Sequence, residues 1–317
     1  MASEHKKTVL IAVAANAAIF VTKAVGGVIS GSTALLAEAA HSLADTTNQL
    51  FLLVSLRLGR RPPDDDHPFG HGQDRFLWAF MAAIFMFVGG AVFAIGYGIK
   101  ELLAPGEEGS FTVAWIVLGV CAVFEVISWV RAVRQTRQES RQAGLPFLRY
   151  IRQSREPTVK AVVFEDTAAV VGIAFAAAGI GLHQATGNPA WDAIGAIAVG
   201  LLLIGTAVAL GRDIRGLLMG EAARPDERRR IEAVLARHDE FAVLELFTIV
   251  LAPQALLVAA RLDLRDDLPG HEVERLSSRV ADELHEAVPD VRQVFLDPTL
   301  PGPDHERQRR ERQVATG

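Results

Sequence analysis

Two groups of ionisable side chains lie inside apolar stretches of the chain. Glu38, His41 and Asp45 occur in one stretch, and Glu165 and Asp166 occur in another. An isolated charge is costly in hydrocarbon, so such residues must pair with one another or bind a cation. Carboxylates together with an imidazole are typical ligands of a divalent metal ion. The pattern therefore predicts a metal site inside a membrane.

The spacing of these residues says which of them can face one ion. His41 and Asp45 are four residues apart and share a face of a helix, with Glu38 one turn earlier on nearly the same side. One helix offers too few donors, because zinc with nitrogen and oxygen ligands usually takes four. Asp166 is the natural complement from a second helix, whereas Glu165 points about 100° away around that helix. We predict His41, Asp45 and Asp166 as ligands and keep Glu165 as a less favourably placed candidate.

A structural reading of the same residues is that they hydrogen-bond across helices. Three acidic or imidazole groups on two helices would repel one another or stay unsatisfied without a cation, which favours the metal reading. Lys23 and Glu125, in two other apolar stretches, are weaker candidates. Lys23 can extend toward the membrane surface, and Glu125 can be a relay, an entry-path group or half of an ion pair.

A second set of donors lies in one short connection. The sequence from Asp64 to Gly72 reads Asp-Asp-Asp-His-Pro-Phe-Gly-His-Gly. These carboxylates and imidazoles can chelate a metal, but Pro and Gly also punctuate ordinary solvated turns. Spacing alone leaves both readings open.

Six apolar segments are long enough to cross a bilayer as helices. They are residues 8–29, 33–56, 76–102, 112–133, 158–183 and 191–211. We expect the first to be a retained helix, because no small-residue cleavage site follows it. Arginines crowd the connections after the second and fourth segments, and this predicts that these connections and both termini are cytoplasmic.

The last third of the chain changes character. A charged helix from Arg224 to His238, a strand from Phe241 to Leu251, a second around Leu256–Leu264, a helix around Val273–Val288 and a strand from Val291 to Leu296 are predicted. The fold class is thus a six-helix transmembrane domain, residues 1–220, followed by a cytoplasmic α+β domain of α-β-β-α-β order, residues 221–300. Residues 301–317 are rich in Pro, Arg and Glu and are predicted to be disordered.

Composition excludes several classes of protein. The 317 residues are 50% hydrophobic and carry a formal net charge of −5. The basic residues do not form an aromatic-interleaved patch, which argues against nucleic-acid binding. The single cysteine, Cys121, excludes a disulfide framework and a thiolate zinc site within this chain. No His-Glu-x-x-His segment occurs, so a metallohydrolase of that type is not expected.

The chain resembles the cation diffusion facilitator family of zinc and related divalent-metal transporters. The resemblance rests on the run Ala39–Asp45, the loop His67–Gly72, the six-segment order and the C-terminal α+β pattern, and it covers almost the whole chain. Within the family it is similar to the branch that contains the mitochondrial zinc exporter of animals. That narrower likeness rests on Asn48-Gln49, the run Glu165–Val170 and the run Thr186–Pro189.

The resemblance implies a transport site with two residues from the second helix and two from the fifth. His41, Asp45 and Asp166 match, but the fourth position holds Val162, which cannot ligate. Glu165, Glu38, a water or a backbone carbonyl must then fill the vacancy. The family's loop site maps onto Asp64, His67 and His71. In the C-terminal domain Arg261 and Phe295 replace the family's histidines, although Asp297 remains, so no metal site is expected there.

The function predicted is a homodimeric exporter of a divalent cation, zinc first, that works by alternating access and proton antiport. Ligands must lose their protons to bind metal, so metal and protons compete for one site. His41 suits this role because an ordinary imidazole titrates at about pH 6.5. Antiport comes from the resemblance. The partners expected are the divalent metal, protons, membrane lipid and a second copy, with no prosthetic group.

Two alternatives stay open. Manganese, iron or cobalt are possible substrates, because an oxygen-rich site with one imidazole discriminates weakly among divalent metals. A non-transporting membrane scaffold or metal-responsive protein is also possible, since Val162 removes a ligand. The location predicted is a plasma or inner cell membrane, because Glu4 and the lack of an Arg-rich amphipathic stretch do not suit a mitochondrial presequence.

Overall fold

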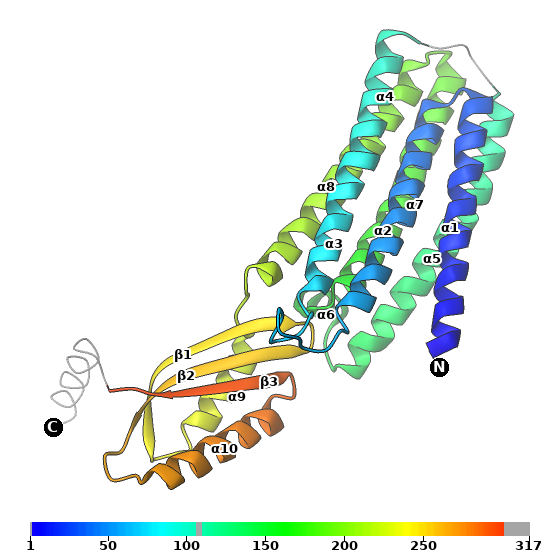
Figure 1. Cartoon of the computed structure of the whole chain (residues 1–317). Coiled ribbons are helices and arrows are strands. Elements are labelled where there is room, and N and C mark those ends of the chain that lie inside the picture. Colours follow the sequence, from blue (N-terminus) through cyan, green and yellow to red (C-terminus); the bar gives the residue numbers. More distant parts are fainter. Residues whose placement is uncertain (1, 106–109, 301–317) are drawn as a thin grey trace. The chain divides into compact units, whose positions relative to one another are not determined.

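The computed structural model describes residues 2–105 and 110–300 (Figure 1). The chain divides into two compact units, Met1–Arg215 and Gly216–Gly317, a division close to the predicted boundary at residue 220. The tail predicted at 301–317 lies outside the described residues. Each unit has its own core and is described by itself.

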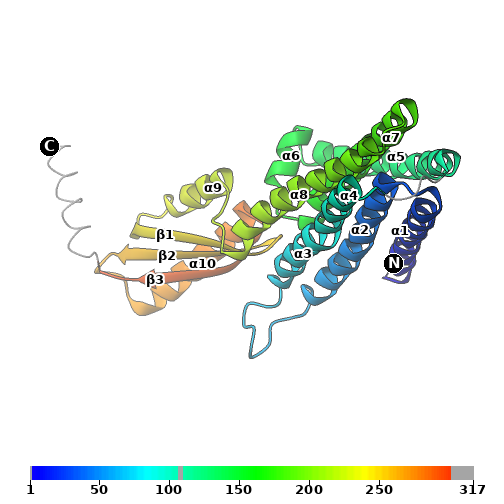
Figure 2. The same ribbon diagram turned by 90° about the horizontal axis from the view of Figure 1, so that it is seen from above.

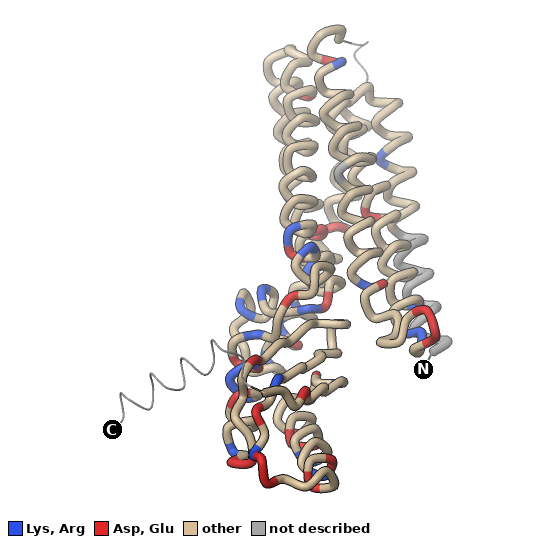
Figure 3. Tube along the Cα trace, turned by 60° about the vertical axis from the view of Figure 1, so that its left-hand side comes forward, with Lys and Arg blue, Asp and Glu red and all other residues tan. Residues whose placement is uncertain are grey.

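The first unit consists of helices. Their bounds are α1 (Ala2–Ser30), α2 (Thr33–Leu58), α3 (Asp74–Phe85), the π-helical segment η1 (Met86–Ala91), α4 (Val92–Leu103), α5 (Phe111–Gln142), α6 (Phe147–Gln153), α7 (Pro157–Thr186) and α8 (Ala190–Leu218). Figure 3 shows that charged residues are sparse along the middle of these helices and denser toward one end of the bundle. This distribution suits helices that cross an apolar layer.

Four helices in the described part of the chain are long and apolar enough to cross a membrane: Asp74–Leu103, Phe111–Gln142, Pro157–Thr186 and Ala190–Leu218. They correspond to four of the six predicted spans. In α1 the apolar helix found within the described residues is the shorter Asn16–Ser30, and α2 carries the polar residues of the predicted site. Six spans therefore stay a prediction.

Helix α2 occupies the centre of the bundle. It packs against α1, α3, α4 and α7, and α5 packs against both α1 and α7. Figure 2, seen along the bundle, shows α2 between α1 on one side and α3 and α4 on the other. Most buried side chains of α2 are small, with alanine the commonest, and these allow the neighbouring helices to approach closely.

The start of α2 is fixed by a carboxylate from α8. The backbone turns at Gly31, whose φ is +67°, and Ser32 then caps the helix by accepting a hydrogen bond from the Leu35 N–H. Asp192 of α8 accepts hydrogen bonds from the Ser32 hydroxyl (2.9 Å) and from the N–H groups of Thr33 and Ala34. A carboxylate at this position satisfies N–H groups that a helix leaves free at its N-terminus.

Two features of the helices differ from the predicted spans. The third span is a continuous helix with a π-helical section at η1, where Gly90 lies so close to α8 that an added Cβ would be 3.0 Å from Leu203 Cδ1. The fourth continues beyond residue 133 to Gln142, and the short helix α6 follows it. The extension of α5 is rich in arginine, so hydropathy alone ended the span too early.

The second unit has the predicted α-β-β-α-β order. It contains α9 (Pro225–Leu235), β1 (Phe241–Ala252), β2 (Ala255–Leu264), α10 (Gly270–Ala287) and β3 (Val291–Pro298). The strand order is β1-β2-β3, with β1 and β2 antiparallel and β2 and β3 parallel. Figure 1 shows α9 and α10 on one face of the sheet.

The core of this unit lies between the sheet and the two helices. Alternate residues of β2, from Leu256 to Leu262, are buried, as a half-buried strand requires. The apolar face of α10 is formed by Leu276, Val280 and Leu284 at helical spacing, as predicted. Both patterns were readable because each element buries one face only.

Candidate metal site between α2, α5 and α7

A small cavity of about 20 Å³ lies among α1, α2, α5 and α7 in the first unit. A cavity of this size holds about one water molecule or one ion. The residues that line it are mostly polar: Asn16, Ile19, Ser42, Asp45, Gln49, Glu125, Ser128, Glu165 and Asp166. Three residues predicted as metal ligands, Asp45, Glu165 and Asp166, therefore share one cavity.

His41 lies beside this cavity on α2. Its side chain is 1% exposed, and its Nε2 is 3.4 Å from Asp45 Oδ2. Within the described residues, neither ring nitrogen of His41 has a hydrogen-bond partner, and neither do Asp45 Oδ1 and Gln49 Oε1. Buried polar atoms in proteins are normally satisfied. Here lone pairs on these atoms are not engaged by hydrogen bonds from the described residues, and such lone pairs can bind a cation.

The two carboxylates of α7 are held by neighbouring helices. Asn48 of α2 donates a hydrogen bond to Glu165, and the hydroxyl of Ser128 on α5 donates one to Asp166 Oδ2 at 3.2 Å. The angle of about 100° between adjacent helical residues does not separate them, because both line the same cavity. Glu165 thus lines the cavity, and Val162 is not among the residues that do. Val162 itself is 37% exposed, whereas Glu165 is 6% exposed.

A buried lysine joins three helices next to this cavity. Nζ of Lys23 on α1 is 3.0 Å from Glu38 Oε2, 2.9 Å from Ser42 Oγ and 3.1 Å from Glu125 Oε1. Lys23 is 1% exposed, so it does not extend to the membrane surface. Of the roles predicted for Glu125, the ion pair is the one seen here, and Glu125 also lines the cavity.

The loop between α2 and α3 brings its predicted donors together. Ligand atoms of Asp64, His67 and His71 all lie within 4.8 Å of one another, and this is the one such cluster found in the described part of the chain. The donors of the cavity between α2, α5 and α7 are therefore spread more widely than those of the loop. The two sites differ in how far their donors must move to bind an ion.

Asp64 holds this loop cluster together. Its Oδ2 is 2.8 Å from His71 Nε2, and its Oδ1 is 3.2 Å from His67 Nδ1. The hydrogen bond to His71, helped by the His67 N–H, lowers the pKa of Asp64 to about 2. The same contact with Asp64, with a smaller contribution from Asp74, raises the pKa of His71 above its ordinary value. Asp74 Oδ2 lies 3.3 Å from His71 Nδ1.

The C-terminal positions that resemble a family metal site form ion pairs instead. Arg261 on β2 pairs with Glu245 on β1 at 3.0 Å and with Asp297 on β3 at 3.4 Å. Its guanidinium thus lies where a cation would otherwise neutralise Asp297.

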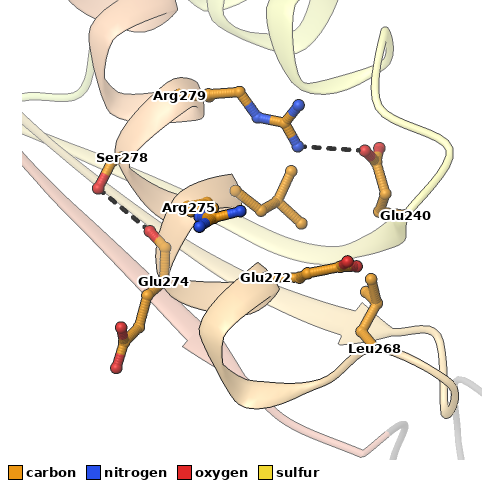
Figure 4. A pocket seen from close by; sticks show the side chains of 8 residues that line it. Glu240, Leu268, Glu272, Glu274, Arg275, Ser278 and Arg279 are labelled. Atoms are coloured by element: carbon orange, nitrogen blue, oxygen red, sulfur yellow. Dashed lines mark hydrogen bonds and ion pairs between the residues drawn. The ribbon is translucent and has the colours of Figure 1, made fainter.

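A larger hollow of about 740 Å³ borders α10 in the second unit. Figure 4 shows its charged side chains around the helix, with Arg279 paired to Glu240 and the Ser278 hydroxyl bonded to the Glu274 backbone carbonyl. Arg279 and Glu240 are both substantially exposed. The hollow is thus lined by both carboxylates and guanidinium groups.

Comparison with known proteins identifies the family. Residues 9–219 match the family model described as the cation efflux transmembrane domain. The chain belongs to this family of divalent-metal exporters, which are transporters and not enzymes. The predicted family and the predicted transmembrane domain are therefore confirmed.

Individual relatives are named proton-coupled zinc antiporter SLC30A9, mitochondrial. The one from Xenopus laevis is 35% identical over 72% of this chain and 41% of its own length, and the one from Homo sapiens is 31% identical over 72% and 40%. Metal tolerance protein C4 of Arabidopsis thaliana is 32% identical over 75% of this chain and 52% of its length. The chain thus spans about two fifths of the animal relatives.

These names overturn one prediction. The relatives from Xenopus laevis and Homo sapiens are called mitochondrial, which points to a mitochondrial membrane rather than a plasma or inner cell membrane. The prediction rested on the N-terminal composition, and the presence or absence of a presequence there does not decide the location.

Sequence reasoning missed several residues around the cavity. Ser128 and Asn48 hold the α7 carboxylates, and Gln49 points an unsatisfied oxygen into the site region. A signal was available for Ser128, which follows Glu125 by three residues and so shares its helix face. Asn16 gave no signal, because its place in the cavity depends on how α1 packs.

Proposed function

We propose that this chain is a proton-coupled zinc exporter whose substrate binds at His41, Asp45, Glu165 and Asp166. The observation that carries the proposal is the set of unsatisfied buried atoms on His41 and Asp45 beside a cavity that two α7 carboxylates share. One imidazole and three carboxylates supply four ligands, the number that zinc usually takes. The relatives from Xenopus laevis and Homo sapiens are named proton-coupled zinc antiporters, which supports zinc as the metal and protons as the coupling ion.

Competition between metal and protons follows from the chemistry of the donors. Imidazole and carboxylates bind a metal only when they are deprotonated, so loading the ion releases protons and protonation expels the ion. Alternating exposure of the cavity to the two sides of the membrane then links proton entry to metal exit. The mitochondrial names of the animal relatives support a mitochondrial membrane as the location.

Two further parts complete the proposal. The loop cluster of Asp64, His67 and His71 is proposed as a second metal site, supported by its close donor atoms. The second unit is proposed to form a homodimer without metal. Three large side chains on the strands, Val243, Phe247 and Phe295, are 40–56% exposed and offer apolar surface for a second copy.

Manganese, iron and cobalt are the alternative substrates. The proposed site has three carboxylates and one imidazole, and oxygen-rich donors suit manganese well. A scaffold without transport is the other class, and membership of the cation efflux family argues against it.

Uptake of Zn²⁺ into proteoliposomes under an imposed pH gradient tests the proposal. Gradient-dependent uptake that is lost in both Asp45→Ala and Asp166→Ala is the expected result. If the wild type takes up manganese, iron or cobalt but not zinc, that other metal is the substrate. If the wild type takes up none of the four metals, the non-transporting scaffold becomes the better hypothesis. For a scaffold, Asp45→Ala should abolish partner binding but leave cellular metal tolerance unchanged.

A further inference from the structure

Two buried atoms beside the proposed zinc site face each other without hydrogen bonds. His41 Nδ1 and Glu38 Oε1 are 3.9 Å apart, and neither has a partner among the described residues. Glu38 is 0% exposed and His41 is 1% exposed. An N–H···O bond has a length of roughly 2.7–3.2 Å, so a shift of about 1 Å would form one. The other ring nitrogen, Nε2, faces Asp45.

Glu38 is not free to turn toward the cavity. Its second oxygen, Oε2, is 3.0 Å from the ammonium of Lys23, which also contacts Ser42 and Glu125. Neither Glu38 nor His41 lines the cavity, whereas Asp45, Glu165 and Asp166 do. However, His41 Nε2 faces Asp45, while Glu38 Oε2 is held by Lys23. The lysine therefore keeps one oxygen of Glu38 away from the ion and leaves the other pointed at His41.

Helix α7 leaves space for this arrangement at Gly172. A Cβ added there would lie 2.3 Å from Glu38 Oε1 and 3.5 Å from His41 Nδ1. The side chain of any other residue would therefore displace the oxygen that faces the imidazole. Glycine at this position is explained by the room that the Glu38–His41 pair needs.

We infer that Glu38, anchored by Lys23 and accommodated by Gly172, is a positioning residue that orients the imidazole of His41 and does not itself bind the metal. Histidines that bind metals usually donate the N–H of their other ring nitrogen to a carboxylate or carbonyl, which fixes the tautomer. Glu38 accepts from Nδ1–H, so that Nε2 is presented to the ion. This inference rests on the proposed function, because it concerns the same site.

The test is Co²⁺ binding to the full chain in detergent, followed by its visible d–d absorption. The background carries Asp64→Ala and His71→Ala, so that the loop cluster does not contribute. Glu38→Gln should weaken Co²⁺ binding by about 10- to 100-fold, the loss typical for such a partner, with unchanged positions and intensities of the absorption bands. Wild-type affinity, or altered bands that report a lost ligand, would overturn the inference.

Gly172→Ala provides a second variant that removes no polar group. It should weaken Co²⁺ binding, whereas Gly181→Ala on the same helix should not, because its added Cβ meets only Trp115 at 3.6 Å. Equal affinity in the two alanine variants would contradict the role given to Gly172. If the unmodified site binds neither Co²⁺ nor Zn²⁺, the proposed function fails together with the inference, and this outcome is distinct from a failure in Glu38→Gln alone.

Discussion

The amide of Asn48 on α2 donates a hydrogen bond to the carboxylate of Glu165 on α7. This contact links the two helices that carry all four proposed ligands, and it fixes one oxygen of a buried acid. Without it Glu165 would be a buried carboxylate with no donor, which is a costly state. The contact supports the proposal that Glu165 replaces the ligand missing at Val162.

Asn48→Leu should therefore weaken zinc binding by about 10-fold or more, because Glu165 loses the donor that orients it. Isothermal titration of Zn²⁺ into the detergent-solubilised protein measures the change. Thr47→Ala is the control, since the Thr47 hydroxyl bonds to the backbone carbonyl of Leu43 on its own helix. If Asn48→Leu binds zinc as the wild type does, then Glu165 does not depend on Asn48 for its role.

A carboxylate at position 162 should substitute for Glu165. Residue 162 precedes Asp166 by four residues and lies on the same helix face. We expect Glu165→Gln to lose most zinc uptake in proteoliposomes and Val162→Asp, added to it, to restore a measurable part. In the wild-type background Val162→Asp should increase zinc uptake little, because four proposed ligands are already present. If Val162→Asp increases zinc uptake as much in the wild type as in the Glu165→Gln variant, then Glu165 is not the fourth ligand.

Zinc binding at the loop should depend on pH. Contact with Asp64 raises the pKa of His71, and His71 must be neutral to bind a metal. Affinity should therefore fall as the pH is lowered from about 8 to about 6, at a higher midpoint than an ordinary imidazole gives. Asp74→Asn removes the other acceptor of His71 and should move the midpoint to lower pH.

Zinc titrations on the full chain with Asp45→Asn and Asp166→Asn isolate the loop site. Without metal, the stability of the folded loop depends on pH in the opposite sense. Because folding raises the pKa of His71, the contact with Asp64 stabilises the loop fully at a pH below the pKa of His71 in the unfolded chain. This stabilisation is lost as the pH rises through the raised pKa of His71 in the folded loop. At the acid end the ion pair is lost as the pH falls through about 2, the pKa of Asp64. A midpoint that Asp74→Asn does not move would show that Asp74 plays no part.

Asp192→Ala should destabilise the first unit by about 0.5–2 kcal/mol, the usual cost of removing a helix cap. The substitution removes the acceptor for Ser32, Thr33 and Ala34 at the start of α2. Thermal unfolding in detergent measures the loss. Arg212→Ala on the same helix is the control, because Arg212 is exposed and substitutions at the surface usually change stability by less than about 0.5 kcal/mol. Equal midpoints for the two variants would argue against the cap.

The sequence predicted those parts of the fold that bury a single face. The alternation along β2 and the helical spacing of Leu276, Val280 and Leu284 gave the order of the second unit. The end of α5 was not predictable from hydropathy, because it continues through arginines. Its buried residues there, Ala132, Thr136 and Ser140, are small and mostly polar.

The candidate site was predictable only as far as one helix determines it. His41 and Asp45 follow from their spacing of four, and the apolar surroundings of Asp166 mark it as unusual. The roles of Ser128, Asn48 and Lys23 depend on how α1, α5 and α7 pack against α2, which no local pattern encodes. The sequence likewise did not reveal that Lys23 lies deep in the bundle.

The ion pair between Lys23 and Glu38 bears on the order in which the chain enters a membrane. These residues are 15 positions apart on two helices joined by the turn at Gly31, whereas Lys23 and Glu125 are 102 positions apart. The hairpin of α1 and α2 therefore carries its own counter-charge during synthesis. Both charges can be neutralised when this hairpin inserts, long before α5 leaves the ribosome to supply the second carboxylate.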